Sequence, residues 1–523
     1  MSHGRRLTRE DYLIGAAAVA SVLLYVAAAS RNGAGFPLDD SWIHQTYARN
    51  LARHGEWAFY LGESSTASTS PLYTLLLAVG YLLRLPHLAW AYALGALTLA
   101  AAGWVNMRLA SRLFPHVPNA GLWTGLMTVC AWHLIWAAAS GMETMLFALL
   151  ALIVIGLAWR EQDALRAGVS GARPAFLRGL LLGAAGAALT LTRPEGLALV
   201  GLAGIAGSAA YLEQGDRRAS RWLVWGLGIA LGWVVGVAPY AVWNYAVSGD
   251  VLPSTASAKQ AEYAATLALP LTRRVWIMLR PLTAGGQIAL LPGLLAALFV
   301  LARRSRRPSA LMFWFPAIWA IGHVVLYALR LPAPYQHGRY VQPVLPVVIL
   351  YGVGGTLWLV QQGQPRFLGR VLSRSLALTV AAVTLGFVII GARAYASDVQ
   401  IINSEMVAAA RWVERHLPPS ELLAAHDIGA LGYFAPRPIL DLAGLLTPEV
   451  VPIIRDHEAL MQLMCARSAR YLMVMPDQRP APAGDPRLGG PPIFETGAPY
   501  SPAAGGGNMA VYALDWTGGC SAE

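Results

Sequence analysis

Long apolar segments follow one another along most of the chain, and short arginine-rich stretches separate them. A straight helix needs roughly 20 predominantly apolar residues to cross a membrane. Hydrophobic residues make up 56% of the sequence and charged residues only 13%, and a soluble core cannot bury that much apolar surface. The sequence therefore predicts a mainly α-helical protein that crosses a membrane many times.

The arginines indicate which side of the membrane each connection faces. They cluster between apolar segments, as Arg108/Arg112, Arg160/Arg166/Arg173/Arg178, Arg217/Arg218/Arg221, Arg303/Arg304/Arg306/Arg307 and Arg366/Arg370/Arg374. Short loops rich in arginine face the cytoplasm. The formal net charge of +11 is therefore a topology signal, and we expect no nucleic-acid partner.

We place these clusters and the basic start MSHGRR on the cytoplasmic side. This arrangement predicts a transmembrane module, residues 1–393, with about 11 to 12 membrane helices. Crossings are expected at 13–30, 88–107, 119–139, 142–159, 177–192, 197–212, 222–240, 283–301, 309–329, 342–362 and 376–392. The apolar segment 71–86 is too short for a straight span. We interpret it as a short or re-entrant helix after a first outer loop, 31–70.

The residues after 393 lose the long apolar runs and lie outside by parity. They predict a small extracytoplasmic α/β domain, 394–523. Its helix-like segment is Glu405–His416, its strand-like segments are Leu422–His426, Pro438–Leu442, Tyr471–Met475 and Met509–Leu514, and Arg479–Pro492 is a loop. Cys465 and Cys520 fall in this domain, where oxidation is permitted. A disulfide between them and two separate thiols both fit the sequence.

The unusual polar clusters all face outward on this map. They are Asp39/Asp40, Ser140–Glu143, Thr192–Gly196, Asn244–Lys259, Tyr335–Tyr340 and His426/Asp427. Charges near a bilayer are costly unless they have partners or a task. A polar pocket at the membrane surface, beside an apolar groove, suits a substrate that is attached to a lipid.

Each cluster also has a purely structural interpretation. Asp39 or Asp40 and Glu143 can open helices as N-caps. Pro194 breaks a helix, so its charged neighbours can form a local ion pair. Lys259 is the only lysine in the chain and suits a point contact with phosphate, but one lysine can also survive by chance. Arg339 can bind phosphate or reach the interface within an aromatic belt.

Five segments add a resemblance that covers most of the chain: SGMET, LTRPEG, WNYAVSGDVLPSTASAK, HGRYVQPVLP and HDIGALGYFAPRPILDLAGL. They resemble blocks of the bacterial GT-C membrane glycosyltransferases, and most of all the actinobacterial terminal arabinofuranosyltransferases. The resemblance implies an inverting transfer, on the outer face, of arabinofuranose or a hexose such as mannose. Polyprenyl phosphate is the implied donor carrier, and a cell-envelope glycan or glycoconjugate the acceptor. Pro253-Ser254-Thr255 departs from the family's proline-asparagine-threonine motif, which leaves the sugar open.

The resemblance and the polar clusters together assign roles. A family outer-loop aspartate is the catalytic base, which here implies Asp39 or Asp40. We expect Lys259, Arg339 and Arg193 to bind the donor phosphate. The expected substrate-binding residues are Trp42, His44, Glu143, Glu195, Tyr335, His337, His426 and Asp427. A divalent metal ion is possible as a cofactor, with Asp40, His44 and Glu63 as candidate ligands.

Two other classes of function compete with an enzyme. A transporter or flippase for polyprenyl-linked sugars also needs many spans and outward phosphate-binding charges. Such proteins carry polar residues near the middle of the membrane and have repeat symmetry, whereas the polar clusters here gather at one face. If the protein were a non-catalytic glycan-binding scaffold, the aspartate pair and the outward arginines would have no function.

Overall fold

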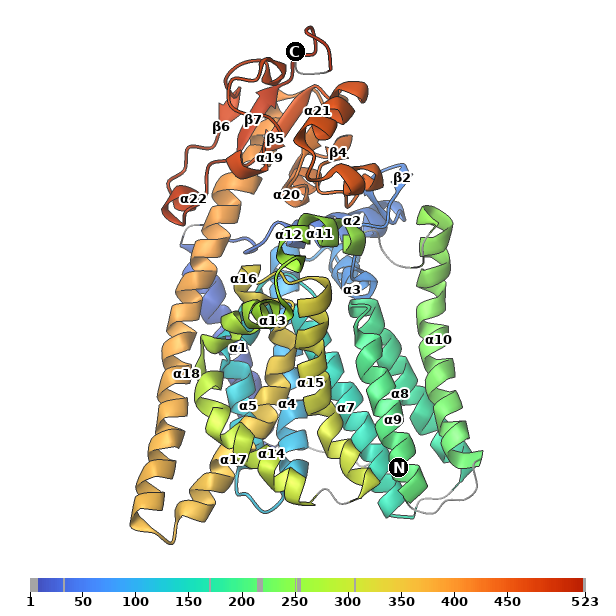
Figure 1. The fold of residues 1–523 in the computed structure, drawn as a ribbon, viewed down its shortest axis with the longest axis vertical. Coiled ribbons are helices and arrows are strands. Elements are labelled where there is room, and N and C mark those ends of the chain that lie inside the picture. Colours follow the sequence, from blue (N-terminus) through green and yellow to red (C-terminus); the bar gives the residue numbers. More distant parts are fainter. Residues whose placement is uncertain are drawn as a thin grey trace.

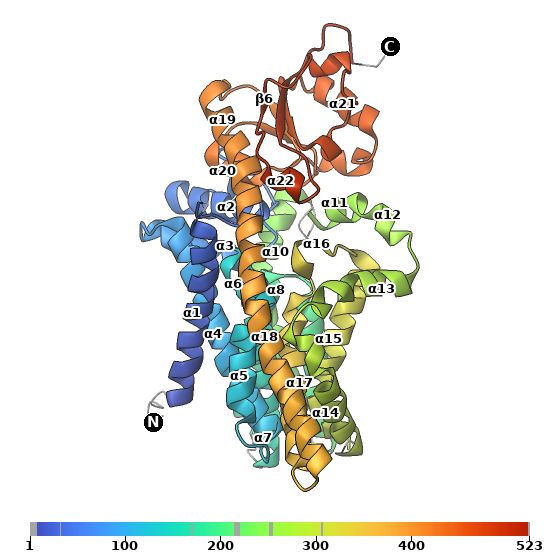
Figure 2. The ribbon, with the colours of Figure 1, turned by 90° about the vertical axis from the view of Figure 1, so that its left-hand side faces the viewer.

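The structure is a computed structural model that describes residues 8–31, 33–168, 171–213, 220–249, 251, 255–304 and 307–520. A bundle of long helices forms one end of the molecule and a small α/β unit forms the other (Figure 1). The described start of the chain lies at the end of the bundle that is far from this unit (Figure 2). The basic start MSHGRR, Arg217/Arg218 and Pro253-Ser254 lie outside the described residues.

The helices of the bundle confirm the predicted polytopic membrane fold. Within the described residues, 10 helices are long and apolar enough to cross a membrane, or up to 11 if a bent pair is counted as one span. They are α1 (Arg9–Ser30), α4 (His87–Leu113), the pair α5 (Ala120–Cys130) and α6 (Trp132–Ala139), α7 (Thr144–Arg166), α8 (Ala172–Thr192), α9 (Gly196–Glu213), α10 (Ser220–Ser248), α14 (Leu291–Arg304), α15 (Leu311–Arg330), α17 (Leu345–Gly363) and α18 (Phe367–Ile402).

Several boundaries differ from the predicted ones. The predicted span 119–139 is bent by 54° between α5 and α6, where the indole N–H of Trp132 donates to the carbonyl of Ala284 at 2.6 Å. Helix α10 runs to Ser248, so the predicted outer loop from Asn244 begins inside a helix. Helix α3 (Pro71–Leu82) has 12 residues, about 18 Å of rise, which is too short for the roughly 30 Å hydrocarbon core.

Helix α18 joins the bundle to the α/β unit and passes through the predicted domain boundary at 393. It continues through a π-helical turn, Asn403–Val407, into α19 (Ala408–His416). The buried carboxylate of Glu405, in this turn, accepts the backbone N–H of Met509 at 2.8 Å and the side-chain amide of Asn508 at 3.2 Å. These hydrogen bonds fix the end of α18 against the sheet of the α/β unit.

The α/β unit is built on a five-stranded sheet of order β4-β3-β5-β7-β6. The strands are β3 (Leu423–Ala425), β4 (Ile439–Asp441), β5 (Tyr471–Val474), β6 (Phe494–Glu495) and β7 (Ala510–Ala513), and the helices are α20 (Gly429–Phe434), α21 (His457–Ala466) and α22 (Tyr500–Ala503). Strands β4, β3 and β5 are parallel, whereas β7 pairs antiparallel with β5 and β6. The predicted strand segments therefore contain β3, β4, β5 and β7. Cys465 and Cys520 form a disulfide.

Short elements fill the layer between the bundle and the sheet (Figure 2). The first outer loop forms α2 (Asp40–His54) and a hairpin of β1 (Ala58–Tyr60) and β2 (Glu63–Ser64). The segment between α10 and α14 forms α11 (Thr255–Glu262), α12 (Ala264–Leu267) and α13 (Leu271–Leu279), and α16 (Tyr335–Gly338) follows α15. Segments distant in the sequence therefore meet in one layer.

Glycines allow α8 and α10 to pack with their backbones in contact. A Cβ atom added at Gly179 or Gly183 of α8 would overlap backbone atoms of Trp225 or Ile229 of α10, and Gly228 and Gly232 of α10 face the α8 backbone in the same way. Small residues four positions apart are the usual means of such close contact between membrane helices. This pair forms one wall of the bundle (Figure 1).

We predict that Gly228→Ala destabilises the protein, whereas Gly226→Ala on the same helix does not. The new methyl group at 228 would overlap the backbone of α8, while nothing lies within 4 Å of a Cβ at 226. Overpacking of this kind costs about 1–3 kcal/mol. Thermal unfolding of both variants in detergent checks the prediction, and equal unfolding temperatures would contradict the close α8–α10 contact.

Candidate active site

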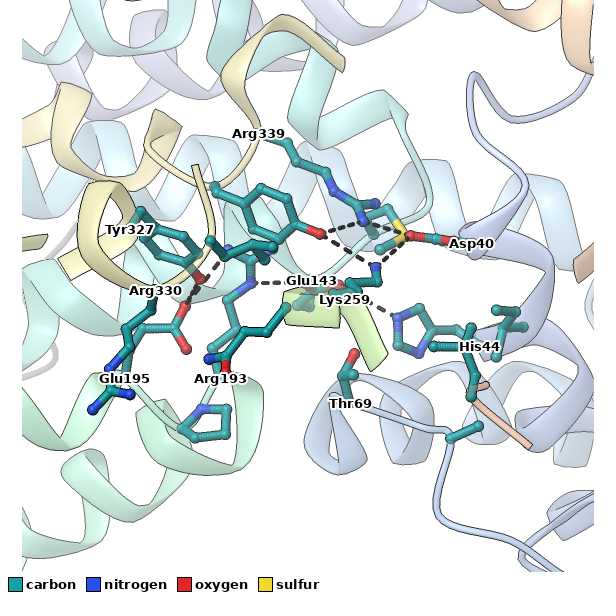
Figure 3. A pocket seen from close by; sticks show the side chains of 18 of the residues that line it. Asp40, His44, Thr69, Glu143, Arg193, Glu195, Lys259, Tyr327, Arg330 and Arg339 are labelled. Carbon is teal, nitrogen blue, oxygen red and sulfur yellow. Dashed lines mark hydrogen bonds and ion pairs between the residues drawn. The ribbon is translucent and has the colours of Figure 1, made fainter. Parts of the chain in front are cut away.

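A cavity of about 510 Å³ lies where the helical bundle meets the α/β unit, and it collects most of the predicted polar residues. Figure 3 shows these side chains converging from α2, the α8–α9 turn, α11, α15 and the segment after α16. The polar side chains that line it are Asp40, His44, Thr69, Glu143, Arg193, Glu195, Lys259, Gln260, Tyr327, Arg330, Arg339 and Tyr340. Apolar walls complete it, including Leu445 of the α/β unit.

Asp40 lies between two cations that come from different parts of the chain. Its Oδ2 atom is 2.5 Å from Nη2 of Arg339 and 3.3 Å from Nζ of Lys259. Burial by itself would raise the pKa of Asp40, but Lys259 and Arg339 outweigh it and hold this pKa below its usual range. The carboxylate is therefore ionised, and the single lysine of the chain lies in the site.

Tyr340 completes this cluster. Its hydroxyl accepts from Nη2 of Arg339 at 3.0 Å and from Nζ of Lys259 at 3.2 Å. Its ring lies 5.1 Å from the guanidinium carbon of Arg193 and stacks on Tyr327. The sequence prediction missed Tyr340 and Tyr327 as site residues. The signal available in the sequence was the position of Tyr340 next to Arg339.

A second charged group occupies the other side of the cavity. Nε of Arg193 donates to Oε1 of Glu143 at 2.7 Å, and Nε2 of His44 lies 3.4 Å from Oε2 of the same carboxylate. Nη1 of Arg193 is 3.7 Å from Glu195, whose carboxylate accepts the hydroxyl of Tyr327. Glu143 precedes α7 as expected for a cap, but its carboxylate is turned toward these two partners.

The predicted helix break at Pro194 explains how two of these charges reach the cavity. Helix α8 ends at Thr192 and α9 begins at Gly196, because proline cannot continue the backbone hydrogen bonding of a helix. The break places Arg193 and Glu195 at the mouth of the bundle, where both line the cavity. The local ion pair that the sequence suggested is present, within a larger network.

The cations of the cavity retain donors that protein groups do not use. Nε and Nη1 of Arg339 are buried and have no hydrogen-bond partner among the described residues, and only 2% of this side chain is exposed. Arg330, at the end of α15, lines the cavity and is exposed. Arg330 was not among the predicted site residues. A phosphate group would satisfy such donors, because guanidinium groups bind its oxygens in pairs.

Asp39 faces away from the cavity although it neighbours Asp40. Its carboxylate accepts the backbone N–H groups of Gly429 at 2.6 Å and Ala430 at 2.8 Å, which open α20. Burial and the nearby charge of Asp427, opposed by these hydrogen bonds, raise the pKa of Asp39 to about 7. The structure therefore separates the pair: Asp40 faces the cavity and Asp39 connects the first outer loop to the α/β unit.

Five of the predicted substrate-binding residues, Trp42, Tyr335, His337, His426 and Asp427, lie outside the cavity lining. Trp42 packs among aromatic rings that include Phe36, Tyr433 and Phe434. The hydroxyl of Tyr335 lies 3.0 Å from that of Tyr340, behind the lining. His337 faces Asp398 of α18 at 2.8 Å.

His426 follows strand β3, and its Nδ1 atom lies 3.6 Å from Asp427. Asp427 in turn accepts from Gln478 at 2.9 Å. This pair belongs to the end of the sheet that carries α20, so it lies near Asp39. His426, Asp427 and Trp42 stay predictions as substrate contacts.

The candidate metal ligands do not gather in one place. Asp40 and His44 line the cavity, whereas Glu63 is exposed on β2 of the hairpin. Over the described ranges of the chain, no group of three or more His, Cys, Asp and Glu side chains could hold a metal ion. The divalent metal stays an untested prediction.

Comparison with solved structures gives the fold. ArnT from Cupriavidus metallidurans bound to undecaprenyl phosphate is similar over 99% of this chain and 100% of that chain, with a TM-score of 0.61 and 15% identity. The archaeal oligosaccharyltransferase AglB from Archaeoglobus fulgidus, in complex with an inhibitory peptide and a dolichol-phosphate, is similar over 89% of this chain and 69% of that chain, with a TM-score of 0.59 and 12% identity. The chain has the GT-C fold. The resemblance that the sequence suggested is confirmed at this level.

Two further comparisons concern the sequence and a larger structure. A family described as a domain of unknown function, DUF8728, matches residues 394–512, and no curated protein matches the chain. The arabinofuranosyltransferase AftD from Mycobacteria is similar over 97% of this chain, which spans 41% of that chain, with a TM-score of 0.50 and 14% identity. At such identities these structures establish the fold alone.

We predict that the stability of the wild-type protein, relative to Asp39→Asn, decreases as the pH rises from about 4 to about 7. The pKa of Asp39 is raised from 3.8 to about 7 in the folded protein. The folded state therefore holds this proton more tightly than the unfolded state does, and the advantage is lost once the pH passes the folded pKa. Asn carries no such proton. As the pH rises over this range, the unfolding temperature of the wild type should therefore fall by a few degrees relative to that of Asp39→Asn. A constant difference across this range would contradict the raised pKa.

Proposed function

We propose that this protein is an inverting glycosyltransferase that moves a sugar from a polyprenyl-phosphate carrier to a hydroxyl group of a cell-envelope glycan or glycoconjugate. The observation that carries the proposal is that Asp40 shares one cavity with Lys259 and Arg339. A carboxylate that can accept a proton and cations that can accept a leaving phosphate are the two groups that this transfer needs.

The solved relatives support the class of donor. One is bound to undecaprenyl phosphate and another is in complex with a dolichol-phosphate, and both have the fold of this chain. In our proposal Arg339 and Lys259 contact the donor phosphate, and Arg193 adds positive charge from the far side of Tyr340. Within the part of the chain that the structure describes, Nε and Nη1 of Arg339 have no hydrogen-bond partner while Nη2 holds Asp40, so we assign these two donors to phosphate oxygens.

The carrier chain needs an apolar path to the same cavity. A second cavity, of about 420 Å³, lies between α13, α14, α15 and α17 and is lined almost entirely by apolar side chains. Helix α15 contributes Val324 and Val325 to this cavity, and Tyr327 and Arg330 to the polar one. We propose that the polyprenyl chain enters along this side of α15.

In the proposed reaction the acceptor oxygen bonds to the anomeric carbon while the bond from that carbon to the phosphate oxygen breaks. The acceptor proton passes to the carboxylate of Asp40. The electron pair of the broken bond leaves with polyprenyl phosphate, whose charge meets Lys259 and Arg339. Arrival of the donor phosphate draws these two cations partly away from Asp40, which raises its pKa and makes it a stronger base.

The side of the membrane is also part of the proposal. Arg108, Arg112 and Arg160 line a cavity between α4, α7 and the start of α1. The start of α1 lies at the end of the bundle opposite the α/β unit (Figure 2). Arginine-rich ends face the cytoplasm, and the disulfide between Cys465 and Cys520 suits an oxidising compartment. Both features support an extracytoplasmic cavity and α/β unit.

The sugar and the acceptor follow the sequence resemblance rather than the geometry. We propose arabinofuranose or a hexose such as mannose as the donor sugar. His44 lies in the cavity beside Glu143, so it is placed to distinguish donor sugars. Incubating the purified protein with a panel of synthetic polyprenyl-phosphate sugars, and following carrier release, tests the function directly.

We predict that Asp40→Asn lowers the rate of transfer by roughly two orders of magnitude or more, as expected when a general base is lost. Asp39→Asn is the matched control, because the same change is made at the neighbouring residue, which faces α20. The control should keep its turnover within a few-fold. Carrier release from a single donor measures both variants, and normal turnover by folded Asp40→Asn would refute Asp40 as the base.

We predict that Lys259→Ala and Arg339→Ala each impair every polyprenyl-phosphate donor to the same extent. The lost contact is to phosphate, which all donors share, and a charged hydrogen bond to it is worth about 1.5–3 kcal/mol. His44→Ala should instead change the ranking among donors. Measuring kcat/KM across the donor panel separates these patterns, and a sugar-dependent effect of Lys259→Ala would argue against phosphate contact.

A further inference from the structure

The backbone that leads into Arg339 is strained. Gln336 has φ +54° and His337 has φ +57°, and Gly338 follows with φ +72°. Residues other than glycine rarely adopt this left-handed conformation, because the Cβ atom approaches the following carbonyl. Two such residues in succession persist only where their surroundings impose the conformation. The loop therefore needs an external support.

That support comes from α18 and α6. Nε2 of His337 lies 2.8 Å from Oδ2 of Asp398 on α18, and the indole N–H of Trp136 on α6 donates to the same oxygen at 2.9 Å. The imidazole ring also meets Trp132 and Trp136 edge-on, at 5.1 and 5.3 Å between ring centres. The imidazole is thus held by one charged group and two aromatic rings.

We propose that His337, held by Asp398 and Trp136, is a positioning residue that keeps Arg339 in place for the donor phosphate. His337 touches no group of the reaction in this proposal, since it lies outside the cavity lining. It fixes the left-handed turn from which Arg339 emerges. The inference rests on the proposed function, because that function assigns Arg339 to the phosphate.

The geometry of Arg339 depends on this turn. Arg339 itself has helical dihedral angles, φ −48° and ψ −32°, and its side chain is almost completely buried, with Nη2 on Asp40. The side-chain amide of Gln342 also holds the carbonyl of His337 at 3.2 Å. If residues 336 and 337 relaxed to the right-handed or extended region, the chain direction at 339 would change. The guanidinium would then leave Asp40 and the phosphate position.

The support also connects the loop to the α/β unit. Asp398 lies on α18, and the π-helical turn with Glu405 at the end of this helix is tied to the strand that begins at Ala510 through Met509. Helix α18 therefore both connects to the α/β unit and supplies Asp398, which holds the turn before Arg339. This helix thus helps to position both the α/β unit and Arg339.

The first experiment removes the support from outside the cavity. For His337→Phe and Asp398→Leu we expect binding of undecaprenyl phosphate, without a sugar, to weaken about tenfold, and the donor KM to rise about tenfold, because a small misplacement suffices for such losses. The value of kcat should fall as well, because Arg339 also meets the charge that develops on the leaving phosphate in the proposed reaction. The matched control is Asp163→Asn, which removes an acidic partner of Arg112 at the opposite end of the bundle and should leave binding and KM unchanged.

The second experiment changes only the backbone preference. Gln336→Gly allows the left-handed conformation without cost, whereas Gln336→Val opposes it, because β-branched residues rarely adopt it. We expect Gln336→Gly to bind undecaprenyl phosphate as the wild type does, and Gln336→Val to resemble Asp398→Leu. This pair keeps the inference testable even if Asp398→Leu does not fold.

The outcomes separate this inference from the proposed function. Wild-type protein that neither binds undecaprenyl phosphate nor transfers a sugar would contradict the proposed function itself. Wild-type protein that binds the carrier, with His337→Phe, Asp398→Leu and Gln336→Val binding equally well, would contradict only the positioning role. A fall in kcat with unchanged carrier binding would also overturn it, because it would place His337 in the chemical step.

Discussion

The carboxylate of Asp40 is held by two cations, and the three groups come from segments far apart in the chain. Asp40 opens α2, Lys259 lies on α11, and Arg339 follows α16. Each charge would be costly to bury without the others, so removing one leaves the rest uncompensated. The first outer loop, the α10–α14 connection and the α15–α17 connection are therefore held in one arrangement by a single carboxylate.

Asp39 and Asp40 are neighbours at the start of α2, but their side chains make different contacts. Successive residues of a helix point in directions about 100° apart, so Asp39 and Asp40 cannot face the same way. The side chain of Asp40 lines the cavity, whereas the carboxylate of Asp39 accepts hydrogen bonds from the first backbone N–H groups of α20. Asp39, which holds α20 of the α/β unit, is therefore the direct neighbour of the proposed base, Asp40. Movement of that unit would be transmitted to Asp40 through the backbone of α2.

The sequence predicts the parts of this protein that depend on hydrophobic patterning, and fails where tertiary contacts decide. Hydropathy and arginine placement locate the helices of the bundle, and short apolar runs locate strands such as Tyr471–Val474. The polar clusters were expected to meet, and Asp40, Lys259 and Arg339 do. Tyr340 and Arg330 look like ordinary interfacial residues in the sequence. His337 was predicted to bind substrate. Its proposed positioning role could not be predicted, because that role depends on Asp398 of another helix, which was not among the predicted site residues.

The arrangement of Arg339 favours a transferase over a transporter. The charged network includes Asp40 of α2 and Lys259 of α11, and both helices lie at one end of the bundle, beneath the α/β unit (Figure 1). Transporters instead place their binding groups near the membrane centre. Arg339 uses Nη2 for Asp40 and leaves Nε and Nη1 for another acceptor. In our proposal, one guanidinium therefore contacts the base and the departing phosphate together. In the proposed reaction, the growing negative charge on the phosphate draws the same cation away from Asp40, so that departure of the leaving group and uptake of the proton reinforce each other.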